Sequence, residues 1–181
     1  MRLWLCLSVI ITLISLASLT LLRHASYCAE TQQAWGEPSQ GISVSLSSLT
    51  HTYHLGDDIN IWTRPRNNSK KMHILWLTGA DYRWIMYDDY GNPVPKTPNA
   101  MANESVFPVG YSELRIQIKL QPGAIFPPID HHEGDAHNIN SWFHITQPGR
   151  YHILAIRRID LDRHGTFDFA LSNMLTIDIT K

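Results

Sequence analysis

The chain of 181 residues has little cysteine, since Cys6 and Cys28 are the two it contains. Cys6 lies in an apolar N-terminal stretch, so a domain without this stretch holds at most one cysteine. Disulfides stabilise small exported domains whose core is insufficient, whereas a chain of about 150 residues buries a sizeable core. The composition therefore excludes a disulfide-rich scaffold and an intrachain disulfide within the domain.

The sequence also lacks the compact motifs of the common enzyme classes. It contains no G-x-S-x-G nucleophile elbow, and neither a glycine-rich phosphate loop nor an H-E-x-x-H zinc motif is present. Each of these motifs holds a catalytic group in a defined geometry, and abundant serine and histidine alone do not. We therefore expect a non-enzymatic protein.

An excess of positive charge is absent as well. Removing Arg2 and Arg23 in the leader from the 15 basic residues leaves 13 against 16 acidic residues in the remaining chain. Nucleic acids and anionic membrane surfaces select basic proteins. The charge balance gives no reason to expect nucleic acid as a partner.

The leader begins with Arg2, continues as an apolar stretch over residues 3–22, and contains no acidic residue. This matches the charged and apolar regions of a secretory signal, so we expect residues 1–29 to direct export to the periplasm or cell envelope. The stretch is long enough that a retained membrane anchor is an alternative. A third alternative is lipidation at Cys28, although the bulky Tyr27 precedes it.

The clearest structural signal is the alternation from Ser112 to Leu120, which is typical of a half-buried antiparallel strand. Similar short runs, separated by turn residues at spacings near ten, predict further strands. They are residues 42–47, 53–55, 59–63, 72–77, 82–87, 142–145, 150–159 and 174–180, with residues 72–77 expected to be a central strand. The intervening residues 30–40, 93–103, 121–141 and 160–166 are predicted to be a tether, two loops and a turn. The pattern indicates an all-β domain over residues 41–181, folded as an antiparallel β-sandwich of about seven to nine strands.

Five motifs in this order resemble bacterial secreted immunoglobulin-like domain proteins. They are Tyr53-His-Leu-Gly-Asp-Asp-Ile-Asn-Ile61, Arg66-Asn-Asn-Ser69, Tyr87-Asp-Asp-Tyr-Gly-Asn-Pro-Val-Pro95, Ile145-Thr-Gln-Pro-Gly-Arg-Tyr151 and Ser172-Asn-Met-Leu-Thr-Ile177. The resemblance spans nearly all of residues 40–181 and implies an immunoglobulin-like sandwich with no catalytic residues. The same turn order is similar, more faintly, to the BsuPI-type proteinase-inhibitor sandwiches.

The densest polar cluster is the run Asp130-His-His-Glu-Gly-Asp-Ala-His137. Zinc and other transition metals accept imidazole and carboxylate ligands. The candidate metal ligands are His131, His132, Glu133, Asp135 and His137. The alternative is a solvated polar loop, because loops are often polar without binding metal.

A second acidic run offers partial calcium-loop spacing. Asp160, Asp162, Gly165 and Asp168 fit the first, third, sixth and ninth positions of an EF-hand loop, but His164 and Leu171 do not fit the fifth and twelfth. Asp and Gly also serve an ordinary strand-to-strand turn. Calcium is therefore less favoured than a transition metal.

Aromatic residues supply the candidate binding residues Trp62, Trp84, Tyr87 and Tyr90. Exposed Trp and Tyr give large contact area together with a polar tip. Alternation places Tyr82, Trp84 and Met86 on one face of their strand, and Arg83, Ile85 and Tyr87 on the other. Core packing is the alternative role for whichever face points inward.

These observations favour a non-enzymatic, exported β-sandwich module of the bacterial envelope that binds another protein or a peptide. Inhibition of exported proteases is one concrete form, in which residues 93–103 or 122–137 would enter an active site. The alternative is a metal-binding periplasmic protein that uses the histidine loop of residues 130–137. Membrane contact is expected only through residues 1–29, if these are not cleaved.

Overall fold

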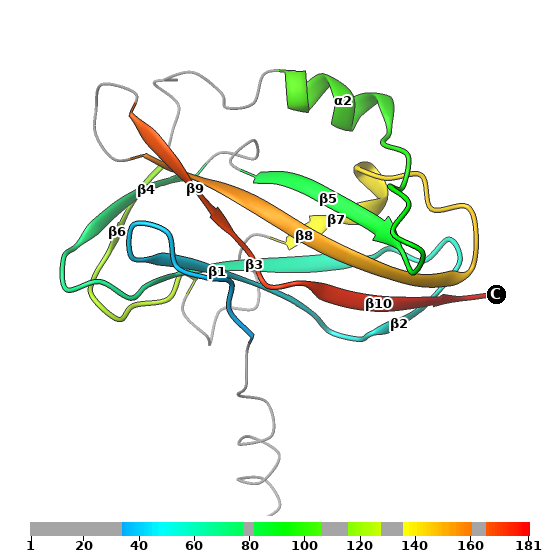
Figure 1. The fold of residues 1–181 in the computed structure, drawn as a ribbon, viewed down its shortest axis with the longest axis horizontal. Helices are drawn as coiled ribbons and strands as arrows, with labels where there is room; N and C mark the ends of the chain where they lie inside the picture. Colours follow the sequence, from blue (N-terminus) through cyan, green and yellow to red (C-terminus); the bar gives the residue numbers. More distant parts are fainter. Residues whose placement is uncertain (1–33, 78–81, 106–115, 128–135, 161–165) are drawn as a thin grey trace, which may run out of the picture. The chain divides into compact units, whose positions relative to one another are not determined.

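The computed structural model describes residues 34–77, 82–105, 116–127, 136–160 and 166–181. This part of the chain is mostly β-structure, with one short helix and one 3-10 turn (Figure 1). The elements are β1 (Ile42–Ser48), β2 (Thr52–His54), β3 (Asn60–Asn67), β4 (His73–Leu77), β5 (Tyr82–Asp88), α2 (Pro98–Ser105), β6 (Ile116–Leu120), β7 (Ala136–Asn138), η1 (Ile139–Ser141), β8 (Gly149–Asp160), β9 (Phe167–Leu171) and β10 (Leu175–Thr180).

The first sheet, sheet A, has the strand order β1-β3-β7 with antiparallel pairing throughout. Strand β3 was predicted to end at Arg64 and Pro65, but it continues to Asn67. Val44, opposite Pro65, turns its carbonyl away from β3 to accept a hydrogen bond from Gly36 N. The missing N–H of Pro65 therefore removes no hydrogen bond to β1, which is the condition under which a strand accepts proline.

The second sheet, sheet B, has the order β2-β10-β8-β5, with β9 also pairing with β8. Its long central strand β8 pairs antiparallel with β5, β9 and β10. The pair β2–β10 is parallel, so the sheet is mixed and the prediction of a purely antiparallel fold is wrong in this detail. Strand β9 was not predicted, although Phe167, Phe169 and Leu171 alternate with period 2.

A third, two-stranded sheet consists of β4 and β6. The strand predicted from residue 112 is present from Ile116 onward, and residues 112–115 lie outside the described residues. The prediction of β4 as a central strand is wrong, because among the described strands it pairs only with β6.

One hydrophobic cluster joins residues from sheets A and B. Alternate residues of β3, β5 and β10 are buried, as half-buried strands require, whereas residues 42–46 of β1 are all buried. The contributing residues include Ile42, Val44, Leu46 and Ile61 from sheet A and Tyr82, Trp84, Met86, Ile153, Ala155, Leu175, Ile177 and Ile179 from sheet B. Of the two faces that alternation separates in β5, the one with Tyr82, Trp84 and Met86 is buried.

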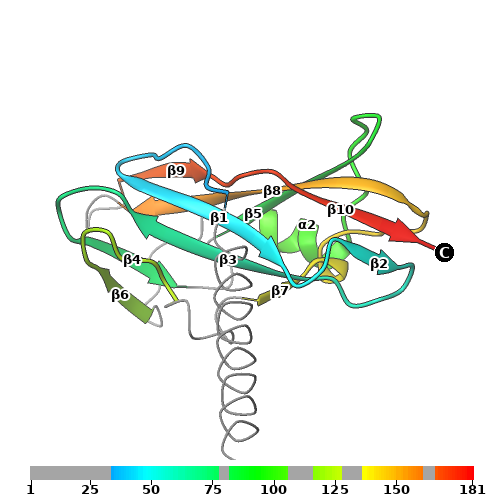
Figure 2. The ribbon, with the colours of Figure 1, turned by 90° about the horizontal axis from the view of Figure 1, so that it is seen from below.

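Beyond β5, the chain crosses toward η1 in a segment that had been predicted to be a loop. Val94 N bonds to Met86 O, and Thr97 bonds to both Trp142 O and Ser141 O. Thr97 Oγ1 also accepts a hydrogen bond from Ala100 N at the start of α2. Figure 1 shows α2 above β5, and Figure 2 gives the view from below.

Three other predicted irregular or extended segments differ in the structure. Residues 121–141 were predicted as one loop but contain β7 and η1. Residues 142–145 were predicted as a strand but form only a single bridge, between Phe143 and Lys96. Residues 34–40 of the predicted tether pack on β1, since Ser45 Oγ donates to Ala34 O.

Close packing also explains why glycine stands at position 36, where a Cβ atom would lie 1.9 Å from Leu171 O.

Candidate binding surfaces

The outer face of sheet B carries a row of apolar side chains, which we call the apolar row. Strand pairing places Ile85 opposite Leu154 and Leu171 opposite Ile156. Phe169 precedes Leu171 by two residues and therefore lies on the same face of β9. Leu171 is 48% exposed and Phe169 39% exposed, and the other three are half-buried. The apolar row consists of Ile85, Leu154, Ile156, Phe169 and Leu171.

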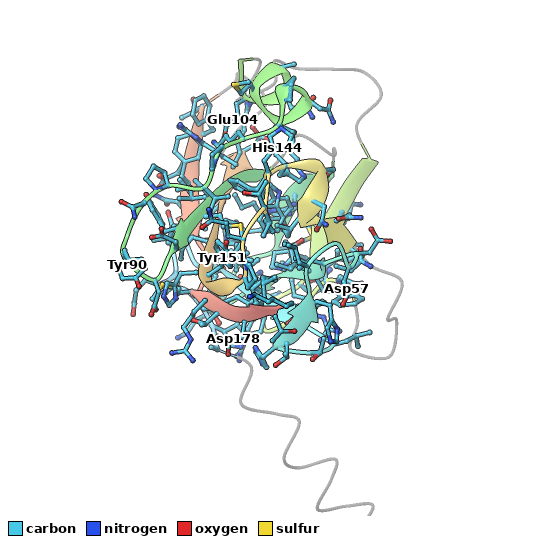
Figure 3. All side chains as sticks on the ribbon, turned by 90° about the vertical axis from the view of Figure 1, so that its right-hand side faces the viewer. Asp57, Tyr90, Glu104, His144, Tyr151 and Asp178 are labelled. Carbon is cyan, nitrogen blue, oxygen red and sulfur yellow. The ribbon has the colours of Figure 1, made fainter. Side chains whose placement is uncertain are left out.

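Charged groups flank the apolar row at the end of sheet B where β8 begins and β5 ends. Arg150 Nε lies 2.9 Å from Asp178 Oδ1, and this contact raises the pKa of Arg150. His152 Nε2 lies 3.3 Å from Asp89 Oδ1, and its Nδ1 lies 3.0 Å from Thr176 Oγ1. Asp178 is labelled at the lower edge of Figure 3.

At the β5 edge, Glu104 of α2 is shared between two cations. Its Oε1 pairs with Lys96 and lies 3.5 Å from Arg83 Nε. Figure 3 shows Glu104 at the α2 side of the domain, opposite Asp178. The apolar row is therefore bordered by ion pairs on both sides.

The tyrosines predicted as binding residues lie at one end of this face. Tyr87 is on the outer face of β5, opposite His152, and is 36% exposed. Tyr90 is 91% exposed in the turn after β5, where Figure 3 shows it projecting at the left.

The turn that presents Tyr90 is held by Asp88. Asp88 Oδ1 accepts hydrogen bonds from Tyr90 N at 3.0 Å and Asn92 N at 2.8 Å, and Oδ2 accepts one from Asn92 Nδ2 at 2.9 Å. These bonds favour the carboxylate, and the Asn92 side chain contributes most to a pKa of Asp88 below its ordinary value.

The two predicted tryptophans do not belong to the same surface. Trp84 is fully buried, with its ring 6.4 Å from that of Trp142, so its proposed role in an exposed aromatic stripe is wrong. Trp62 is half-buried on the outer face of sheet A, opposite Ser47. Alternation alone could not tell which face of each strand was covered.

Of the five predicted metal ligands, His137 is described. It lies in β7, with its ring 5.3 Å from Tyr82 and 5.0 Å from Trp84. His131, His132, Glu133 and Asp135 lie outside the described residues. Within the ranges that the structure describes, no group of three or more His, Cys, Asp and Glu side chains could hold a metal ion.

The two described aspartates of the partial calcium spacing are already engaged. Asp160 pairs with Arg158 at 2.7 Å. Asp168 lies in β9 and accepts hydrogen bonds from Phe169 N, Ser39 Oγ and Gln40 Nε2. The bond from the Phe169 backbone is the main cause of a lowered pKa of Asp168.

The residues of the apolar row that belong to β8 and β9 were not among the binding residues predicted from the sequence. Leu154, Ile156, Phe169 and Leu171 are exposed or half-buried on the face of β8 and β9 opposite the core. The signal was present in the alternation of residues 167–171. A five-residue run directly after a turn is too short to be distinguished from part of that turn without its pairing partner.

Comparisons with known proteins add little. No family model and no curated protein matches the chain. Among solved structures, a beta-glucosidase from Listeria innocua in complex with isofagomine is similar with a TM-score of 0.34 and 11% sequence identity. The match covers 77% of this chain and 16% of the beta-glucosidase chain, and a likeness this weak supports no assignment. No helix in the described ranges is long and apolar enough to span a membrane.

Proposed function

We propose that this protein is a non-enzymatic, exported binding module that docks a folded protein partner on the outer face of sheet B. The observation that carries the proposal is the apolar row bordered by ion pairs. Protein-binding surfaces typically have an apolar centre and a polar, solvent-accessible rim. Export, to the periplasm or cell envelope, rests on the apolar leader of residues 1–29.

The proposal includes an immunoglobulin-like sandwich of sheets A and B. Three observations support it: the strand orders β1-β3-β7 and β2-β10-β8-β5, the cluster that both sheets share, and a hydrogen bond from Tyr151 OH to Gln147 O at 2.7 Å. Immunoglobulin-like domains often have such a tyrosine corner at the start of the sixth strand of the fold. Tyr151 lies near the start of β8, and in the proposed fold β8 corresponds to this sixth strand.

An apolar centre with a polar rim is the pattern of a protein-binding surface, whereas small ligands are bound in concave sites. The border groups are of both signs: Arg83 and Arg150 on the one hand, and Asp89, Glu104 and Asp178 on the other. Such a border does not select a strongly acidic or basic partner. It fits a surface with a mixed charge pattern and an apolar centre.

The test is site-specific photo-crosslinking in the cells that produce the full chain. A photoreactive residue replaces Tyr87 or Leu171 on the proposed face. Matched controls carry it at Leu49 or Met101, which are 84% and 55% exposed elsewhere. We expect one adduct of the same mass from both test positions and from neither control.

A further variant, Phe169→Glu, places a charge at the β9 end of the apolar row and should abolish that adduct while the protein remains folded. Adducts from all four positions, or from none, would overturn the proposal. An adduct of twice the mass of the chain would also overturn it, because the occupant would then be a second copy.

A further inference from the structure

The outer face of sheet A presents two arginines from β3. The alternation of this strand turns Trp62, Arg64 and Arg66 away from the core, all three half-buried. Alternate residues of a strand lie about 6.6 Å apart along its axis, so the two guanidinium stems are neighbours. Trp35 joins them, because the Arg66 guanidinium carbon lies 5.7 Å from the centre of its ring. We call these four residues the Arg–Trp row.

Arg64 and Arg66 differ in their partners from the other described arginines. Arg83 pairs with Glu104, Arg150 with Asp178 and Arg158 with Asp160, while Arg157 donates to Tyr82 OH. Within the part of the chain that the structure describes, Arg64 and Arg66 have no carboxylate partner. Their positive charges are therefore not neutralised by the described protein groups.

Both side chains are also partly removed from water. The Nε atoms of Arg64 and Arg66 are buried and have no hydrogen-bond partner among the described residues. Burying a charge or a polar donor without a partner costs free energy. A bound anion would offset that cost, and the packed stems hold the guanidinium groups ready for it.

The surroundings are polar or basic. Ser43 lies opposite Arg66 and Ser45 opposite Arg64 on β1. Both serines are buried, and Ser43 Oγ accepts a hydrogen bond from Asn68 Nδ2. The turn that follows β3 adds Lys70 and Lys71 near the Arg66 end of the strand.

We propose that Arg64 and Arg66 bind an oxyanion, the carboxylate or phosphate group of a ligand whose apolar or ring-bearing part packs on Trp35 and Trp62. The planar guanidinium fork matches both oxyanions, and charge-assisted hydrogen bonds are the strong ones. This site lies on a different sheet from the apolar row. It stands or falls independently of the proposed docking face.

The test uses the full-length chain in a mild non-ionic detergent, with NMR detection of the arginine Nε–H signals. Sodium acetate and sodium phosphate are titrated separately, at ionic strength held constant with chloride. We expect saturable shifts of the Arg64 and Arg66 signals with at least one of the two anions. Which anion saturates distinguishes a carboxylate from a phosphate ligand.

Matched variants separate a site from general charge attraction. Arg64→Gln and Arg66→Gln should each lower at least tenfold the affinity for the anion that saturates. Arg64→Lys should lose less affinity than Arg64→Gln. Arg150→Gln, which removes an exposed arginine on sheet B, should leave the affinity unchanged. Shifts that never saturate, or that appear equally at Arg150, would overturn the proposal, as would affinities unchanged in the two glutamine variants.

Discussion

The side chain of Asn173 hydrogen-bonds to the backbone of Leu46. Asn173 Oδ1 accepts from Leu46 N at 2.6 Å, and its Nδ2 lies 3.3 Å from Leu46 O. Leu46 belongs to β1 of sheet A, while Asn173 lies between β9 and β10 of sheet B. The neighbouring Ser172 forms a parallel bridge with Val44. One asparagine thus acts as a strand partner for β1 where the two sheets meet.

Asn173→Ala should lower the free energy of unfolding by about 1–3 kcal/mol, because a partly buried amide and carbonyl lose their partners. Urea unfolding at pH 7 measures the change. Asn99→Ala, an exposed residue of α2, is the control and should change stability by less than about 0.5 kcal/mol. Equal stability of Asn173→Ala and wild type would show that the contact between β1 and Asn173 contributes nothing.

Asn67, the last residue of β3, has a similar role at the turn that follows this strand. It is fully buried, its Nδ2 donates to Lys71 O and Leu120 O, and its Oδ1 accepts from Ser69 N and Ser69 Oγ. Through Leu120 it connects the end of β3 to β6. The asparagine–serine motif of the sequence is therefore explained by turn geometry.

We expect Asn67→Ala to cost about 2–3 kcal/mol, since buried backbone groups are left without partners. Asn68→Ala is a close control, because the exposed Asn68 side chain makes one hydrogen bond, to Ser43. That variant should cost no more than about 1 kcal/mol. Chemical denaturation of the two variants side by side decides the matter, and equal losses would contradict the assignment.

The sequence predicted the strands whose alternation is sustained. β1, β5 and β10 followed from period 2, because the alternation of apolar and polar residues separates two faces in each strand. Trp84 could not be assigned to the inside from the sequence, since both faces of β5 carry aromatic residues. Likewise, the pairing partners of β4 depend on contacts distant in the chain.

The helix α2 was missed although it had a local start signal. Thr97 precedes Pro98, and a Thr cap followed by proline in the first helical position favours a helix start. The surrounding prolines suggested a loop instead. What holds the eight-residue helix is tertiary contact, since Ala100 is 1% exposed and Glu104 pairs with Lys96. A helix this short is marginal by itself in water.

Tyr151→Phe tests the tyrosine corner on which part of the proposed fold rests. The change removes one hydroxyl, and with it the hydrogen bond to Gln147 O, while keeping the ring in the core. We expect a loss of about 1 kcal/mol in the free energy of unfolding. Tyr90→Phe, which alters an almost fully exposed ring, should be neutral. If both variants unfold at the same urea concentration as wild type, the corner has no role in stability.

The lowered pKa of Asp88 predicts a pH dependence of stability with a definite sign. Its pKa in the folded protein is below its ordinary value of 3.8, mainly through the Asn92 side chain. The folded state therefore binds this proton less readily than the unfolded state. The stabilising contribution is fully present above the unfolded pKa, and it is lost as the pH falls through the folded pKa. Asp168 shifts in the same direction and adds to the effect.

Asp88→Asn keeps a side-chain oxygen for the turn but removes the titration. We expect the melting temperature of this variant to fall less steeply than that of wild type as the pH is lowered below about 4, and Asp88→Asn combined with Asp168→Asn to fall less steeply still. Glu37→Gln, at an exposed carboxyl without an ion pair to any described residue, is the control and should follow wild type. Parallel melting curves for wild type and Asp88→Asn across this range would mean that the turn hydrogen bonds do not favour the carboxylate. Because the group is exposed, high salt should reduce the difference between the two proteins.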